Sequence, residues 1–152
     1  MEAAVFRDST GLWIIRGLTR IYFGAEDDLP APGDYDGDGT DELAWYRPSR
    51  GLWKIRGFTR FYFGTAADGP VSAFYGPGGM IPAYFRPSTR YWHIRGVTRF
   101  YFGNYSEFPV PADYDGDGLA DPAYFRAPTG LWTLRGITRT YAGRAQDIPV
   151  VR

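Results

Sequence analysis

One motif constrains the fold of this chain more than any other feature, because it recurs four times at a spacing of about 40 residues. The copy at residues 52–64 reads Leu-Trp-Lys-Ile-Arg-Gly-Phe-Thr-Arg-Phe-Tyr-Phe-Gly, and near-copies begin at Leu12, Tyr91 and Leu131. A period of this length is typical of arrays in which each repeat is one supersecondary unit that buries its apolar face against a neighbour. We therefore expect four equivalent structural units.

Each unit consists of short apolar and aromatic runs separated by Gly, Pro and Thr, with no helical periodicity. Such runs predict strands joined by tight turns. Around the second motif the predicted strands are 43–47, 52–56, 59–63 and 70–74. Within 52–56, Trp53 and Ile55 share one face while Lys54 lies on the other, and this alternation supports a strand. The sequence predicts an all-β fold with four strands per unit.

Four four-stranded units of this size predict a single β-propeller domain over residues 1–152. The predicted blades are 3–24 plus 148–151, 29–64, 69–103 and 108–143. Since the chain opens inside a repeat, we expect strand 148–151 to return to the first blade and close the ring by strand exchange. The alternative is two chains that form an eight-bladed ring. A monomer is slightly favoured, because an intramolecular contact has the higher effective concentration.

Two acidic loops, 34–42 and 113–121, indicate metal binding. Each has Asp at positions 1, 3 and 5, Gly at position 6 and an acid at position 9. When such a loop curls, the alternate carboxylates converge on one centre and position 7 offers a backbone carbonyl. This set of hard oxygens suits Ca²⁺ better than Mg²⁺. Asp and Gly also form turns without a metal, but two loops in the same register, with mutually repelling carboxylates, favour a cation.

The third equivalent loop, 74–80, has lost every carboxylate, and we expect it to bind no metal. The sequence therefore predicts two calcium ions per chain and no zinc site, since the chain has no cysteine.

The acidic loop and the strand after it, Leu43-Ala44-Trp45-Tyr46-Arg47-Pro48-Ser49, resemble the FG-GAP/VCBS-type repeats of bacterial β-propellers. Those repeats share Asp-Xaa-Asp-Gly-Asp-Gly followed by a strand that ends in Phe/Tyr-Arg-Pro. The resemblance covers essentially the whole chain and implies calcium in the loop, adhesion or binding roles, and an extracellular or cell-surface location in the parent protein. By this resemblance the ligand sets are Asp34, Asp36, Asp38, Thr40 and Glu42 in one loop, and Asp113, Asp115, Asp117, Leu119 and Asp121 in the other.

The tryptophans that mark the register have two interpretations. They either pack the core between blades, which is the favoured interpretation, or form pockets with Tyr and Arg that bind a glycan or a protein ligand. The residues concerned are Trp13, Trp53, Trp92 and Trp132. A lectin-like propeller is therefore the alternative to a binding or scaffold module.

The charged residues argue against several other classes of function. The 17 basic residues equal the 17 acidic ones, and the arginines recur with the repeat rather than along one patch, so we expect no nucleic-acid binding. The arginines are predicted to be structural and to stack on neighbouring rings such as Tyr62. The acids of the turn 26–28 are predicted to be solvated.

An enzyme is not expected. His93 is the single histidine, cysteine is absent, and no serine has the setting of a nucleophile. The chain also lacks a long apolar run, so no membrane insertion is expected, and its first residues lack the order of a signal peptide.

Overall fold

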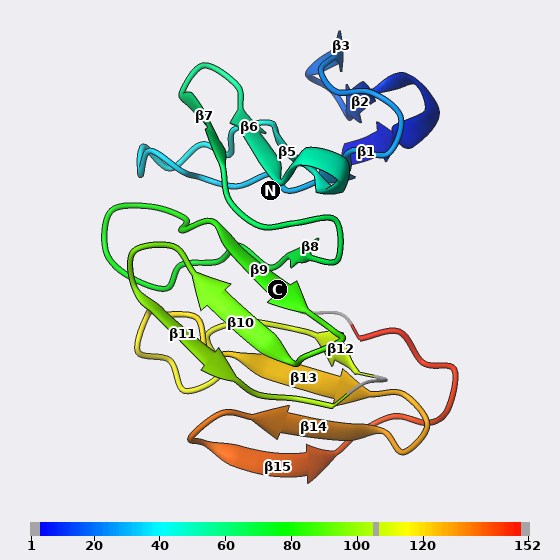
Figure 1. The fold of residues 1–152 in the computed structure, drawn as a ribbon, viewed down its shortest axis with the longest axis vertical. Helices are drawn as coiled ribbons and strands as arrows, with labels where there is room; N and C mark the ends of the chain where they lie inside the picture. Colours follow the sequence, from blue (N-terminus) through cyan, green and yellow to red (C-terminus); the bar gives the residue numbers. More distant parts are fainter. Residues whose placement is uncertain (1–3, 105–106, 150–152) are drawn as a thin grey trace.

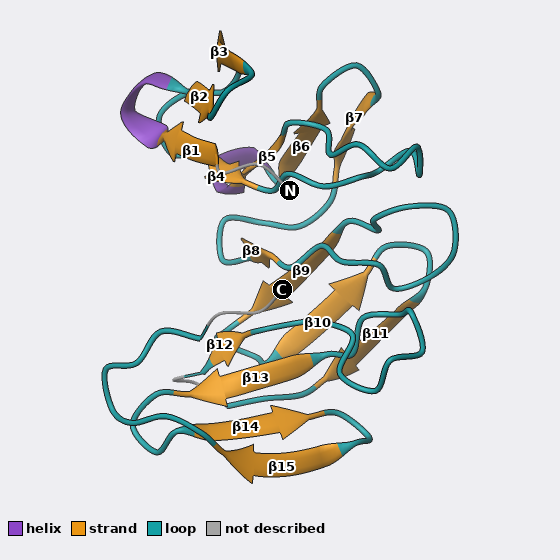
Figure 2. Cartoon of the chain, turned by 180° about the vertical axis from the view of Figure 1, so that it is seen from behind, coloured by secondary structure: helices purple, strands orange, loops and turns teal. Residues whose placement is uncertain are grey.

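The computed structural model describes residues 4–104 and 107–149 and shows an all-β chain (Figure 1). Four antiparallel blades are arranged as a β-propeller, so the fold class predicted from the repeat is confirmed. Two single-turn 3₁₀ helices, η1 (Asp8–Thr10) and η2 (Pro48–Arg50), are the helical elements of the described residues (Figure 2). In that part of the chain, no helix is long and apolar enough to cross a membrane.

The four sheets contain the following strands in chain order. They are β1 (Ala4–Arg7), β2 (Leu12–Ile15) and β3 (Thr19–Tyr22) in the first blade; β4 (Leu29–Pro30), β5 (Ala44–Arg47), β6 (Leu52–Ile55) and β7 (Thr59–Tyr62) in the second; β8 (Gly69–Pro70), β9 (Ala83–Arg86), β10 (Tyr91–Ile94) and β11 (Thr98–Tyr101) in the third; and β12 (Phe108–Pro109), β13 (Ala123–Arg126), β14 (Leu131–Leu134) and β15 (Thr138–Tyr141) in the fourth.

The innermost strand of each complete blade is shorter than the sequence suggests. Where a strand is expected over 70–74, the structure has β8 at Gly69–Pro70. Beyond β8 the pairing continues only through the backbone nitrogen of Val71, which donates to the Ala83 oxygen, and through an isolated bridge between Ala73 and Ile81. The strand expected at 148–151, which would complete the first blade, is not observed as such. Ile148 and Pro149 lie outside any strand, and residues 150 and 151 lie outside the described residues. The first sheet therefore contains β1, β2 and β3 among the described residues.

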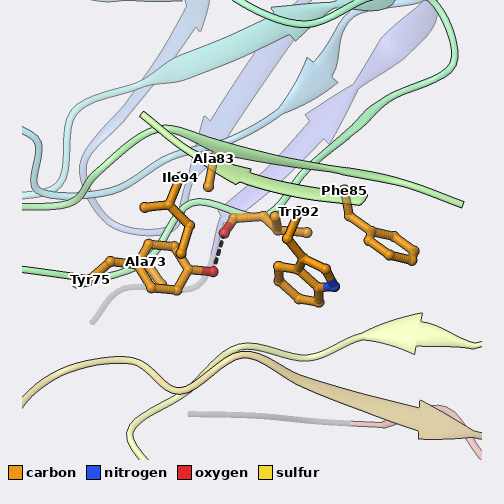
Figure 3. Packing of buried hydrophobic residues seen from close by; sticks show 7 residues of the cluster. Ala73, Tyr75, Ala83, Phe85, Trp92 and Ile94 are labelled. Atoms are coloured by element: carbon orange, nitrogen blue, oxygen red, sulfur yellow. Dashed lines mark hydrogen bonds between the residues drawn. The ribbon is translucent and has the colours of Figure 1, made fainter. Parts of the chain in front are cut away.

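The core consists of clusters of apolar side chains. In the third blade, side chains of the sheet pack against the loop that follows its innermost strand and against Ala120 of the next blade's loop. In the third blade, Trp92 and Ile94 alternate with half-buried His93, as the strand pattern predicts. Figure 3 shows this cluster, with Phe85 beside the indole and Tyr75 donating a hydrogen bond to the backbone oxygen of Val71. Burying one large apolar side chain such as Phe85 or Ile94 stabilises the fold by about 1.5–3 kcal/mol. The cluster therefore stabilises the third blade.

Ion pairs join the second, third and fourth blades to the linker that arrives from the preceding blade. In the third blade, Arg86 donates from Nε to Asp68 Oδ1 over 2.7 Å and from Nη2 to Oδ2 over 2.9 Å. Arg47 binds Asp28 in the same way, and Arg126 binds Glu107 through Oε1. The three carboxylate side chains are at most 1% exposed. The prediction that Asp28 belongs to a solvated turn is therefore wrong, since its side chain lies inside the junction.

Rings and guanidinium groups reinforce the junctions. Phe63 of the second blade packs on Tyr84 of the third with 4.8 Å between ring centroids, and Phe102 packs on Tyr124 of the fourth at 4.9 Å. Arg95 lies 4.2 Å above the Phe61 ring of the preceding blade. The structural role predicted for the arginines holds here, but the stacking ring is Phe61, whereas the neighbouring Tyr62 is exposed.

Consecutive blades are neighbours in space (Figure 1). Figure 1 places β1–β3 at one end of the longest axis and β14–β15 at the other, with the second and third blades between them. The hydrogen bonds, ion pairs and ring contacts that cross between blades in the described residues join consecutive blades.

Replacing Arg86 by methionine tests the blade junction. Arg86→Met leaves the Asp68 carboxylate buried without its partner, and we expect a loss of about 3 kcal/mol in the free energy of unfolding, near the lower end for such changes because Arg86 itself is partly exposed. Urea denaturation followed by fluorescence measures this loss. Arg60→Met is the control, because Arg60 is exposed and forms no ion pair in the described structure. Equal stability of the two variants would contradict the assignment.

Candidate metal centre

Both acidic loops connect the innermost strand of a blade to the next strand, and a short antiparallel bridge closes the base of each. Gly33 pairs with Glu42 in the first loop, and Ala112 pairs with Asp121 in the second. The Gly33–Glu42 bridge consists of two backbone hydrogen bonds of 3.2 and 2.9 Å. Because the bridge returns the last acid of the loop to its first, position 9 lies beside position 1.

Three acids converge in each loop. Asp34, Asp36 and Glu42 each place one carboxylate oxygen within 4.8 Å of the others, and Asp113, Asp115 and Asp121 do the same in the second loop. Of the predicted carboxylate ligands, Asp38 in the first loop and Asp117 in the second lie outside these groups of three. Thr40 and Leu119, predicted to offer backbone carbonyls, stay a prediction.

Backbone hydrogen bonds hold the acids of the first loop in place. Asp34 accepts from the backbone nitrogens of Gly37 and Gly39 over 2.7 and 3.0 Å, and Glu42 accepts from that of Tyr35 over 2.8 Å. Gly37 and Gly39 both have positive φ, at 79° and 89°, a conformation that few other residues adopt. The acids therefore have a structural role in shaping the turn, in line with the alternative that Asp and Gly form such turns without a metal.

The second loop reproduces this network. Asp113 accepts from Gly116 and Gly118 over 2.6 and 3.0 Å, and Asp121 accepts from Tyr114 over 3.0 Å. The same bonds form although the surrounding residues differ, so the arrangement belongs to the repeat and not to one loop.

The turn bonds leave part of each acid set available to a cation. Glu42 Oε1 and the second oxygens of Asp36 and Asp38 accept no hydrogen bond within the described part of the chain. The ion pairs of the described residues involve other acids, so no arginine or lysine neutralises the cluster. Uncompensated carboxylates this close repel one another, and their hard oxygens fit Ca²⁺, which accepts irregular coordination.

A tyrosine at loop position 2 anchors each loop, a residue that the sequence analysis did not single out. Tyr35 donates from its hydroxyl to the backbone oxygen of Ala31 over 2.7 Å, and Tyr114 donates to that of Val110 over the same distance. Burial raises the pKa of Tyr35 to about 12. The signal was present in the sequence, since Tyr75 occupies the same position in the loop without carboxylates and bonds to Val71.

The loop without carboxylates packs against the first acidic loop. The backbone nitrogen of Met80 donates to the backbone oxygen of Asp34, and Met80 packs on the cluster of Tyr35, Ala44 and Ile55. A Cβ atom at Gly33 would lie 1.7 Å from Met80 Sδ, so a larger residue there would require the Met80 side chain to move.

The tryptophans proposed as ligand contacts are mostly enclosed. Trp13, Trp53 and Trp92 are buried, and Trp132 is half-buried. Each indole donates to a backbone oxygen of the chain that leaves the blade, as Trp53 does to Phe63 over 2.7 Å. This placement agrees with the core interpretation, since a buried indole has no free face for a ligand.

His93 lies in the junction between the second and third blades. Its Nδ1 is 3.2 Å from the Tyr84 hydroxyl, and its ring packs edge-on against Phe63 with 4.8 Å between centroids. Burial, and to a smaller extent the nearby Arg99 charge, lower its pKa. The ring is thus packed in an aromatic junction.

Comparisons with protein-family models, with curated proteins and with solved structures gave no match to this chain. The function is therefore inferred from the geometry of the two loops and from the exposed surface.

The lowered pKa of His93 predicts a pH dependence of stability. The unfolded chain binds a proton at this residue near pH 6.5, the folded chain only at lower pH, so stability falls as the pH drops through about 6.5. His93→Thr introduces the residue found at the equivalent position in the fourth blade, and it should remove the loss of stability that protonation of His93 causes. Melting temperatures of both proteins between about pH 8 and about pH 5 measure the difference, and parallel curves would contradict it.

Proposed function

We propose that this chain is a non-catalytic, calcium-binding β-propeller that serves as a binding or scaffold module, for example in adhesion. The observation that carries the proposal is the convergence of three carboxylates in each of two loops in the same repeat register, with no basic partner in the described structure. The resemblance of these loops to FG-GAP/VCBS-type repeats points to the same metal.

Calcium would fix the loop that joins the innermost strand to the rest of its blade. In the first loop Asp34, Asp36 and Glu42 would hold the ion, with Asp38 and the carbonyl of Thr40 completing the set if Asp38 turns its free oxygen inward. The ion would cancel the repulsion among the acids and stabilise the folded loop. Weak sites of this kind are typical of extracellular modules, and we place the module outside the cell or at its surface.

A glycan-binding role is the second candidate, and the outer strands favour it. Tyr22, Tyr62, Tyr101 and Tyr141 are between 73% and 75% exposed, one on the outermost strand of every blade. In each strand an exposed arginine lies two residues earlier and hence on the same face. Exposed rings stack on sugar faces, and guanidinium groups bind anionic substituents. These four tyrosines, here called the tyrosine row, therefore replace the tryptophans as the candidate glycan-binding surface.

Calcium binding is tested by calorimetry on chelator-treated protein. We expect two sites per chain with dissociation constants of about 10⁻⁴–10⁻³ M. At a calcium concentration about 100-fold above the dissociation constant, each site should add about 2.7 kcal/mol to the free energy of unfolding. A protein that shows neither heat of binding nor a rise in melting temperature with calcium would contradict the proposal.

Single substitutions assign the two sites. Asp36→Asn and Asp115→Asn should each remove one site, and the double variant should bind no calcium. Asp41→Asn is the matched control, because Asp41 lies in the first loop and makes the same charge change but is outside the cluster. A similar loss of binding in the control would indicate a non-specific effect of charge.

The glycan alternative is tested with a glycan array in the presence and absence of calcium. Binding by the wild-type chain that is lost in Tyr62→Ala/Tyr101→Ala, with an unchanged melting temperature, would support it. Binding that survives these changes would exclude the tyrosine row as the contact surface.

A further inference from the structure

The two ends of the propeller expose complementary halves of the junction that is repeated inside it. At each internal junction, an arginine is the last residue of the blade's second strand. It binds a carboxylate near the end of the linker that arrives from the preceding blade. The pairs are Arg47 with Asp28, Arg86 with Asp68, and Arg126 with Glu107. Three repetitions define what a complete junction requires.

Arg7 is the arginine half without its carboxylate. It pairs across the sheet with Leu12 just as Arg47 pairs with Leu52, so it stands at the same position of its blade. Arg7 is exposed and has no ion-pair partner within residues 4–104 and 107–149. No linker from a preceding blade of the same chain reaches it there.

Asp147 is the carboxylate half without its arginine. Its Oδ2 accepts from the backbone nitrogen of Arg144 over 2.7 Å, as Asp28 Oδ2 accepts from Ala25 over 2.8 Å. The linker after the fourth blade is thus folded in the form that receives an arginine elsewhere in the chain. Unlike Asp28, however, Asp147 is exposed and forms no ion pair in the described structure.

The apolar part of the junction is open at both ends as well. Trp45, Tyr84 and Tyr124 pack on a phenylalanine of the preceding blade, whereas Val5 at the equivalent position is 64% exposed. The position equivalent to those phenylalanines in the fourth blade is Ala142, which is also exposed. Small residues on both sides allow the two ends to approach without a clash.

We propose that a second copy of this chain completes the propeller, with Arg7 of each copy bound to Asp147 of the other. The strands of the first and fourth blades lie at opposite ends of the longest axis (Figure 1), and no ion pair of the described residues joins Arg7 to Asp147 within one chain. Two copies joined head to tail satisfy both, and a head-to-tail interface that closes gives a ring, here of eight blades. The charge complementarity and the repeat of an existing junction identify the partner, and calcium binding is not required for it.

Mixing two charge-reversed variants tests the proposal. The wild-type chain should have twice the chain mass of 17.1 kDa by light scattering. Arg7→Asp and Asp147→Arg should each weaken self-association, on the order of tenfold for each of the two contacts, because like charges then meet at both junctions. An equimolar mixture should restore the dimer, since every junction in the mixed pair again joins an acid to an arginine.

The controls separate a second copy from closure within one chain. Arg20→Asp makes the same charge change on the exposed outer strand of the first blade and should leave the dimer intact. Circular dichroism checks that each variant is folded. A wild-type protein with the mass of one chain at all concentrations, a mixture that stays monomeric, or a series of larger open assemblies would each overturn the eight-bladed ring.

Discussion

A buried carboxylate between consecutive blades is the interaction on which the rest of the structure depends. Asp28, Asp68 and Glu107 have lost contact with water, and the compensating charge comes from an arginine of the following blade. A buried charge without its partner is strongly unfavourable, so the linker can adopt its folded form at low cost only when the next blade is in place. The ion pair therefore sets the spacing of the blades, while the rings around it supply most of the apolar contact.

The acidic loops are built on a framework that does not itself need acids. A tyrosine at position 2 secures all three loops through its hydroxyl, including the one that contains no carboxylate. That third loop uses Met80 to pack against its neighbour, where the other two present oxygen atoms. The shared tyrosine bond explains how a loop without acids can keep its place in the blade, whereas the acids of the other two loops shape their own turns and leave some carboxylate oxygens without a hydrogen bond in the described structure.

Much of this architecture could be predicted because the sequence contains four copies of the same unit, and comparing them shows which positions stay constant. Alternation along the strand around Trp53 indicated which side chains are buried, and the spacing of Asp34, Asp36 and Glu42 indicated a common centre. Asp38 was not separable from them, because its turn bond to Thr40 depends on local backbone geometry. The partner of Asp28 was missed for a different reason, since Arg47 belongs to another blade and only the folded junction brings the two together.

Each internal junction takes its carboxylate from one repeat and its arginine from the next, and this has a genetic consequence. In-frame duplication or deletion of the DNA that encodes one repeat of about 40 residues adds or removes one linker carboxylate and one arginine together. The first arginine and the last acid of the product remain, whichever internal unit is gained or lost. An array with this phase can change its number of blades in a single recombination event and still keep matching ends, which makes ring size an accessible variable during evolution.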